Sequence, residues 1–472
     1  MAKKRFTTAE LLEMDRLHIW HPFTPMKAWM EKTDTPVIVR GQDEFLFDSQ
    51  GRKYIDAVSS LWCNIHGHHV PDLDQALRDQ LDQVAHTTLL GLCNVPSIEL
   101  AARLVDIAPP GLKKVFFSDN GSTAVEVACK MAYQFWANRG EPGKSRFLAF
   151  GDAYHGDTLG AVSVGGIQVF HQVYAPLCFP VDRVNPPRLA PFSALNAAVA
   201  GIGDQSAPMP AWEEGIESLL AASAGKYAAI IVEPVVQGAG GMIMHPPGTL
   251  TRLRRLADRH NILLICDEVM TGFGRTGRMF ACQHEKVCPD LLCLSKGLTA
   301  GYMPLGATLT TSGIFEAFYD DPCAGKTFFH GHTYTGHPLA CAVGVASLEL
   351  FEKRNLLEHE REMGQVLWRE LAPLADHPQV GDVRQVGLVA AVDVVKNRQT
   401  GERYPWHWRV GGELCTAMRA GGILIRPLGD VLVIMPPLAI GVESIVTTAR
   451  VVVEYVQRCL PGILAQREAA ES

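Results

Sequence analysis

Between about residues 110 and 310, short continuous apolar runs alternate with longer stretches of helical spacing. The apolar runs lie at residues 113–118, 146–150, 228–233, 262–266, 291–294 and 305–310. Runs of this length without polar alternation are typical of strands buried on both faces. After the first run, Val125, Ala128 and Ala132 recur at helical spacing, and residues 250–260 predict a further helix. This alternation predicts an α/β fold with a mostly parallel central sheet and right-handed crossovers.

The two ends of the chain follow a different pattern. The N-terminal part predicts a helix at residues 8–17 and short antiparallel strands over residues 36–54. Beyond about residue 355 we expect an α+β layer. Its elements are a charged helix, a strand at 388–394, a helix at 410–420 and a hairpin that pairs 423–426 with 431–435. Arg426 falls in an apolar strand of this hairpin, so we expect it to be buried against a carboxylate of the protein or of a substrate.

The composition is that of a globular enzyme. The 472 residues are 47% hydrophobic and 20% charged, and the formal net charge of -7 argues against nucleic acid as a partner. No apolar run approaches the length of a membrane span, and the basic N-terminus lacks the apolar core of a secretory signal. The twelve cysteines form no CxxC pair, and several lie inside apolar runs, which indicates reduced thiols. We therefore expect a cytoplasmic protein.

A carboxylate and an amine follow two of the predicted central strands. Asp267 comes directly after residues 262–266, and Lys296 comes shortly after residues 291–294. Ligands bind at the carboxyl ends of the strands in open α/β sheets, so we expect the two side chains to meet there. Pyridoxal phosphate is the leading ligand, because its aldehyde takes a lysine as a Schiff base and its ring nitrogen needs an acid that keeps it protonated.

The segment that follows residues 113–118 has the features of an anion site. Gly121 and Ser122 stand at the start of the predicted helix, where free N–H groups and the helix dipole favour a phosphate. An ordinary capped helix start would show the same residues, and it is the lysine and the acid that favour the phosphate. Thr333 lies in a second polar turn that opens a helix, and it is a further phosphate contact. Tyr154 and His155 follow residues 146–150 and form an aromatic pair that can stack on a planar ring.

Two further motifs invite other interpretations. Residues 272–277 match GxGxxG, but no long helix follows, so we disfavour a dinucleotide site. We expect a glycine-rich active-site loop there, with Arg275 and Arg278 facing solvent or an anion. Three histidines within residues 66–69 suggest a metal, but no acid or cysteine stands at ligand spacing, so we expect no metal site. The proline- and alanine-rich residues 185–215 support no prediction of a role.

Taken together, the chain resembles the fold-type I, class III pyridoxal-phosphate aminotransferases over nearly its whole length. The motifs that carry the resemblance are SDNGSTAVE, YHGDTLGAVSVGG, EPVVQGAGGM, CDEVMTGFGRTG, LSKGL and HGHTYTGHPLAC, in this order. Within the class, HIWHPFT, YHGDT and IRPLGD–IMPPL are similar to the 7,8-diaminopelargonate synthases of biotin biosynthesis. That family transfers an amino group to 8-amino-7-oxononanoate, usually from S-adenosylmethionine. The resemblance implies a large cofactor-binding domain at residues 63–340 and a small domain built from residues 1–62 and 341–472.

The resemblance also implies roles for individual residues and a homodimer with shared active sites. The residues that it implicates in catalysis are Lys296, which holds the Schiff base, Asp267, which binds the pyridinium nitrogen, and Tyr154. It implies that Gly121 and Ser122 take the phosphate together with His332 and Thr333 of the neighbouring subunit, while His155 contacts the cofactor. The residues that it places around the substrate are Phe23, Trp62, Tyr154, Gly331 and Arg426, of which Arg426 receives the substrate carboxylate.

The identity of the amino donor is open. Many relatives that use S-adenosylmethionine have a Trp-Trp pair at Leu61-Trp62, a tyrosine at Phe23 and a phenylalanine at Leu428, and some relatives use lysine instead. An ω-amino acid or amine:pyruvate aminotransferase is an alternative, because the stretch HGHTYTGHPLA is shared with those enzymes. A cofactor-binding protein without catalysis is a third reading, and it is disfavoured because Lys296 and Asp267 are both present.

Overall fold

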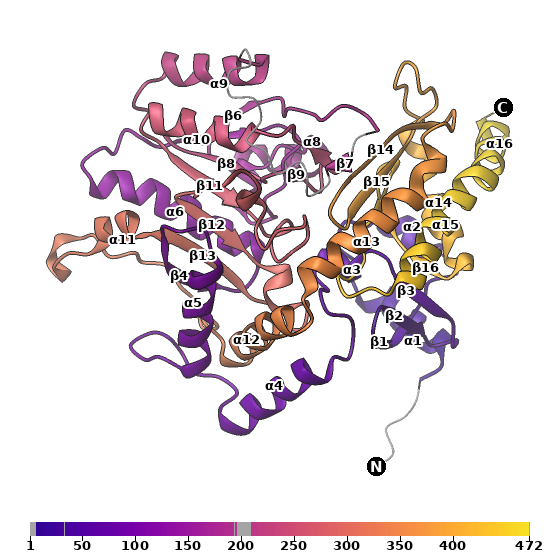
Figure 1. Ribbon diagram of the computed structural model, residues 1–472, viewed down its shortest axis with the longest axis horizontal. Helices are drawn as coiled ribbons and strands as arrows, with labels where there is room; N and C mark the ends of the chain where they lie inside the picture. Colours follow the sequence, from indigo (N-terminus) through magenta and orange to yellow (C-terminus); the bar gives the residue numbers. More distant parts are fainter. Residues whose placement is uncertain (1–5, 33, 193, 196–208, 472) are drawn as a thin grey trace.

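The computed structural model describes residues 6–32, 34–192, 194–195 and 209–471. A seven-stranded sheet runs through the larger part of the molecule, in the order β4-β13-β12-β11-β8-β5-β6 (Figure 1). Its strands are β4 (Leu112–Ser118), β5 (Arg146–Phe150), β6 (Val181–Val184), β8 (Tyr227–Val232), β11 (Leu263–Asp267), β12 (Leu291–Leu294) and β13 (Gly306–Thr311). Strand β13 is antiparallel to both of its neighbours, and β12, β11, β8, β5 and β6 are parallel to one another. The predicted α/β fold with a mostly parallel sheet is confirmed.

Helices that follow the strands cover the central sheet. They include α6 (Gly121–Asn138), α7 (Leu159–Val164), α9 (Ala211–Ala222), α10 (Thr249–Arg259) and α11 (Ser312–Phe318). The helices α4 (Pro71–Gln83) and α5 (Val95–Ile107) both pack against α12 (Pro338–Lys353). Helix α6 buries the predicted side chains Val125, Ala128 and Ala132 in one core cluster with Ile265 of β11. Burying each larger apolar side chain stabilises the fold by about 1.5–3 kcal/mol, so the stripe fixes α6 on the sheet.

The two chain ends lie together beside the large sheet. Strands β1 (Ile38–Gln42), β2 (Phe45–Asp48) and β3 (Lys53–Asp56) form a sheet with β16 (Ile423–Leu424). A second sheet has the order β17-β18-β15-β14-β7. Its strands are β17 (Arg426–Leu428), β18 (Val431–Ile434), β15 (Val389–Val394), β14 (Val380–Val386) and β7 (Ala194–Leu195). Figure 1 shows these N-terminal strands next to the C-terminal helices α14 (Val410–Ala417), α15 (Val442–Arg458) and α16 (Leu460–Glu471).

The proposed domain limits, 1–62 with 341–472 and 63–340, stay a prediction. The remaining helices of the chain ends are α1 (Thr8–His18), α2 (Met26–Met30), α3 (Ser59–Trp62) and α13 (Leu356–Leu371). Of the proline- and alanine-rich stretch, residues 193 and 196–208 lie outside the described residues. Among the helices of the described ranges, none is long and apolar enough to cross a membrane.

The predicted C-terminal hairpin is wrong in its length and in one partner. Of the residues predicted to form the first hairpin strand, only Arg426 pairs with β18, as the first residue of β17. Residues 423 and 424, which were predicted to belong to the hairpin, form the separate strand β16. This strand pairs in parallel with β3, where Ile423 lies opposite Ile55. A pairing between residues so far apart in sequence leaves no local pattern, whereas a hairpin does. The predicted strand at 423–426 therefore covers all of β16 and the first residue of β17, and these two strands belong to different sheets.

Candidate active site

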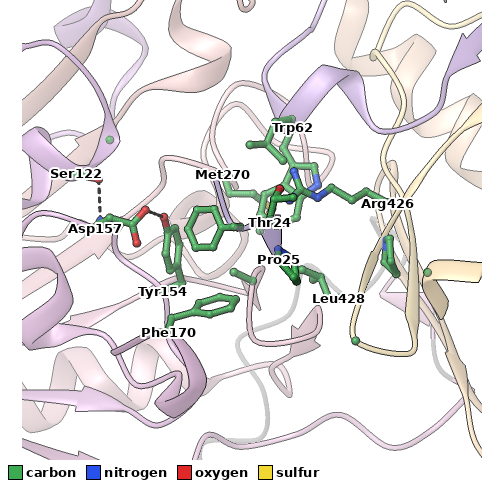
Figure 2. Close-up of a pocket in the computed structure, with 18 of the residues that line it drawn as sticks. Thr24, Pro25, Trp62, Ser122, Tyr154, Asp157, Phe170, Met270, Arg426 and Leu428 are labelled. Carbon is green, nitrogen blue, oxygen red and sulfur yellow. Dashed lines mark hydrogen bonds between the residues drawn. The ribbon is translucent and has the colours of Figure 1, made fainter. Parts of the chain in front are cut away.

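A cavity of about 1320 Å³ lies where the central strands end. It is lined by Asp267, the last residue of β11, and by Lys296, which follows β12. Gly121 and Ser122 line it from the start of α6. Figure 2 shows Tyr154 and Phe170 on one side of the cavity and Arg426 and Leu428 on the other. The strand ends therefore bring the predicted acid, amine and helix terminus to one space.

Two neighbours hold the Asp267 carboxylate in place. Its Oδ2 lies 2.7 Å from Nδ1 of His155, and its Oδ1 accepts the backbone N–H of Val269 at 3.0 Å. Asp267 is 4% exposed and His155 is 3% exposed. The other ring nitrogen of His155, Nε2, is buried and has no hydrogen-bond partner among the described residues. A buried, oriented carboxylate of this kind can bind a protonated ring nitrogen.

Burial favours the neutral form of the Lys296 amine. Desolvation lowers the pKa of Lys296, and the negative charges of Asp267 and then Glu233 oppose that shift. The residue stands two positions after the end of β12 with φ of 43°, in the left-handed region. Its Nζ lies 5.5 Å from the centre of the Trp62 ring. A neutral amine in a cavity can bind covalently to an aldehyde and can accept a proton.

The N-terminus of α6 has the geometry of an anion cup. Asn120 caps the helix by accepting the N–H of Thr123 at 3.0 Å, and the N–H groups of Gly121 and Ser122 have no acceptor within the helix. Gly156 has φ of 124°, and a Cβ added there would lie 2.1 Å from Oγ of Ser122. Only glycine allows this loop to close on the helix start. The cup therefore fits a phosphate group.

Tyr154 is held at the wall of the cavity. Its hydroxyl donates to Oδ2 of Asp157 at 2.6 Å. Burial, followed by the bond to Asp157, raises the pKa of the Tyr154 phenol. The ring lies 6.4 Å from that of Phe23 and 6.3 Å from that of Phe170, between centroids. These three rings form an aromatic surface on one side of the cavity.

The opposite side carries Arg426, and here the prediction of a buried arginine is wrong. Arg426 is exposed and lines the cavity with Trp62 and Phe23. Its guanidinium makes no salt bridge within the described ranges, so it is available to an anion from outside the chain. The alternation of the short strand β17 turns Arg426 toward the cavity, although its neighbours in sequence are apolar. Leu61 and Leu428 also line this space.

Three predicted residues do not reach the cavity of their own chain. Gly331, His332 and Thr333 lie in the polar turn before α12, and none of them lines the cavity. The Nε2 atom of His332 lies 3.5 Å from Oδ2 of Asp119, which precedes α6. Their predicted contribution to a neighbouring subunit stays a prediction.

The glycine-rich loop shows a further correction. Arg275 faces neither solvent nor an anion, because it is 0% exposed and donates to the carbonyls of Pro436 at 2.5 Å and Asn64 at 3.0 Å. It thus holds the loop to two distant segments. Arg278, by contrast, is exposed, as expected.

The histidines of residues 66–69 each have a separate partner. His66 contacts Ser347, while His68 and His69 pair with Asp56 and Asp74. Within the described part of the chain, no cluster of three metal-ligating side chains occurs.

Sequence reasoning assigned no role to several residues that line the cavity, among them Glu233, Asp157 and Phe170. Glu233 follows β8, the parallel neighbour of β11, and its place after a buried strand was a usable signal. Asp157 stands within the YHGDT motif, where the polar cluster marked it. Phe170 comes from α8 (Gln168–His171), and nothing in its surroundings in sequence indicated a site.

A lysine, a buried carboxylate and a helix N-terminus at the strand ends of an α/β sheet define the site of a pyridoxal phosphate-dependent enzyme. The comparisons with known proteins agree. Residues 28–455 match the model of the family described as aminotransferase class-III. The chain belongs to the class-III aminotransferases, whose cofactor is pyridoxal phosphate, and it therefore acts on small amino and keto compounds.

Several relatives are similar over nearly the whole chain. The adenosylmethionine-8-amino-7-oxononanoate aminotransferase of Geobacter sulfurreducens is 51% identical, over 93% of this chain and 96% of the relative. A solved structure of the enzyme of that name from Methanocaldococcus jannaschii has a TM-score of 0.88 and 39% identity, covering 95% of this chain and 98% of that one. An ω-transaminase from Pseudomonas jessenii, solved in complex with PMP, has a TM-score of 0.88 and 30% identity, covering 96% and 99%.

Proposed function

We propose that this chain transfers an amino group from S-adenosylmethionine to 8-amino-7-oxononanoate, giving 7,8-diaminononanoate for biotin biosynthesis. The observation that carries the proposal is the 51% identity to a relative of that name over 93% of the chain. The cavity supports it, because a free guanidinium faces the lysine and the carboxylate across a largely apolar space. The acceptor has matching chemistry, with a carboxylate at one end of an aliphatic chain and a ketone near the other.

The roles of the residues follow from their positions. Gly121 and Ser122 would hold the cofactor phosphate, and Asp267, oriented by His155, would keep a proton on the ring nitrogen. Tyr154 would contact the cofactor and the substrate. Bound pyridoxal phosphate supplies a protonated ring that stabilises negative charge on the carbon next to the transferred nitrogen.

With pyridoxal phosphate bound, Lys296 would hold its aldehyde through Nζ. Burial lowers the pKa of Lys296 and so favours the neutral Nζ that would take the proton from the donor carbon. The same Nζ would then return the proton at the end of this half-reaction. The same steps in reverse deliver the nitrogen to the ketone, which predicts ping-pong kinetics.

Arg426 is one of several charged residues that line the cavity, with Arg409, Glu413 and Asp430 among the others. Arg426 binds the carboxylate of the acceptor, and its fork of donors suits a carboxylate. Phe23 and Trp62 cover the aliphatic chain. In a homodimer, Gly331, His332 and Thr333 of each subunit complete the cavity of the other. We place the enzyme in the cytoplasm.

A half-reaction scan tests the function. S-adenosylmethionine, lysine, putrescine and 1-phenylethylamine are added singly to the cofactor-loaded enzyme, and loss of its visible absorbance is followed. We expect S-adenosylmethionine to discharge the absorbance and 8-amino-7-oxononanoate to restore it. Discharge by simple amines, with restoration by pyruvate and none by 8-amino-7-oxononanoate, would instead identify an amine:pyruvate aminotransferase.

A further inference from the structure

A second buried carboxylate, Glu233, lies beside Asp267. The parallel strands β8 and β11 place Val232 opposite Cys266, so Glu233 and Asp267 follow at adjacent strand ends. Glu233 is 4% exposed, and it lines the cavity together with Asp267 and Lys296. Two carboxylates thus face one amine from neighbouring strands, and the proposed mechanism uses only one of them.

The Glu233 carboxylate ties two loops together. Its Oε1 accepts the backbone N–H of Tyr154 at 3.0 Å, and its Oε2 accepts the backbone N–H of Gly238 at 2.9 Å. Tyr154 belongs to the segment after β5, and Gly238 begins the glycine-rich turn after β9 (Val236–Gln237). A carboxylate that uses both oxygens in this way has a fixed orientation. The backbone before His155 is therefore anchored by this side chain.

Four charged or titratable groups surround Glu233. Burial raises the pKa of Glu233 to about 7, Asp267 adds to the shift, and His155 and the two backbone N–H groups oppose it. Glu233 in turn favours the protonated form of Lys296 and the neutral form of Tyr154. A negative charge on Glu233 therefore acts on Nζ of Lys296, the atom that takes up and releases protons in the proposed mechanism.

We propose that Glu233 is a positioning residue of this active site, which fixes the Tyr154–His155 segment and whose negative charge favours a proton on the Lys296 nitrogen. This inference rests on the proposed function, in which Lys296 carries the cofactor. It separates two roles, a clamp that depends on the length of the side chain and a charge that depends on the carboxylate.

Three variants distinguish these roles. Glu233→Gln keeps the length and removes the charge, but its amide has one acceptor oxygen instead of two, a loss that the control Glu268→Gln shares. Glu233→Asp keeps the charge, but it is one methylene too short to bridge both N–H groups. Glu268→Gln is the matched control, because Glu268 is 0% exposed and accepts the backbone N–H groups of Ala281 and Cys282 at 2.5 and 2.8 Å, but does not line the cavity.

The first measurement is the pH midpoint of the visible absorbance change of the cofactor-loaded protein, in the absence of substrate. We expect Glu233→Gln to lower this midpoint by about one pH unit, the scale of an opposite charge lost nearby. Glu233→Asp and Glu268→Gln should leave it unchanged. An unchanged midpoint in Glu233→Gln, or an equal shift in Glu268→Gln, overturns the charge role.

The second measurement is hydrogen exchange of the peptide that covers residues 153–158, in the same loaded proteins. We expect at least about tenfold faster exchange in Glu233→Asp, because the anchored N–H of Tyr154 is released, and no change in Glu268→Gln. If residues 153–158 of Glu233→Asp exchange hydrogen at the wild-type rate, the positioning role of Glu233 is wrong. This measurement alone decides the inference if Glu233→Gln does not fold. A wild-type protein that shows no lysine-bound absorbance would contradict the proposed function instead.

Discussion

The imidazole of His155 reaches across a strand to the carboxylate of Asp267, with 2.7 Å between Nδ1 and Oδ2. His155 follows β5 and Asp267 ends β11, and the sheet order places β8 between these strands. Both side chains are buried. The pair therefore joins two strand ends below the cavity and leaves the carboxylate able to accept one further donor.

Asp267→Asn tests this relationship. The amide keeps the shape of the side chain but cannot hold the ring nitrogen of the cofactor protonated. We expect kcat to fall by roughly 10²- to 10⁴-fold, the usual scale for a positioned proton-managing group. Steady-state kinetics measures the effect, and the exposed Asp258→Asn serves as the control. Full activity in Asp267→Asn would contradict the assigned role.

Lys296→Ala should abolish turnover while the cofactor still binds. The contacts of the phosphate cup and of Asp267 do not depend on the amine, so binding persists without a covalent bond. Borohydride reduction followed by peptide mapping should label Lys296 in the wild type and no lysine in the variant. Lys113→Ala removes an exposed lysine and should keep both label and turnover. Near-wild-type rates in Lys296→Ala would refute the assignment.

Gly156→Ala should weaken cofactor binding by at least about tenfold. The added Cβ would lie 2.1 Å from Oγ of Ser122 and 2.8 Å from its Cα, so the loop must move away from the phosphate cup. Gly140→Ala is a matched control, because Gly140 also has a positive φ, of 80°, but a Cβ there meets nothing within 4 Å. Both variants carry about 1–3 kcal/mol of backbone strain. Fluorescence titration should show a raised dissociation constant for Gly156→Ala alone.

How much of the site could be predicted depends on the range of each signal. Asp267 and Lys296 were predictable, because each follows a continuous apolar run and parallel strand ends share one edge of the sheet. The pairing of β16 with β3 was not, because its partners are far apart in sequence. The prediction that Arg275 faces solvent or an anion was wrong for a similar reason. The carbonyls that it binds belong to Asn64 and Pro436, which are far from it in sequence.

Arg426→Ala should raise KM for 8-amino-7-oxononanoate by about 10- to 100-fold, which matches the loss of about 1.5–3 kcal/mol from a charged hydrogen bond. The rate at saturation should change much less, because the guanidinium lies on the opposite side of the cavity from Tyr154 (Figure 2). An acceptor analogue in which an amide replaces the carboxylate provides the control, since its KM should not respond to the substitution. A uniform loss for both acceptors would indicate a structural role.

Stability should fall as the pH rises toward 8, in part because of Glu360. Burial in α13 raises the pKa of Glu360 from 4.5 to about 8, against the opposing effects of the Leu388 backbone and Arg275. Between these values the folded state holds a proton that the unfolded state has released, so stability is full below about pH 4.5 and is lost as the pH rises through 8. The contribution is at most about 1.4 kcal/mol per pH unit.

Glu360→Gln removes this titration, because the amide is neutral at every pH. We expect urea unfolding at pH 5.5, 7.0 and 8.5 to show a shallower loss of stability in the variant than in the wild type. The comparison between the two proteins cancels the contributions of Glu233 and Glu268, whose pKa values burial also raises. Glu362→Gln, at an exposed position of the same helix, should keep the wild-type slope. Parallel curves for wild type and Glu360→Gln would show that Glu360 is ionised in the folded protein throughout this range.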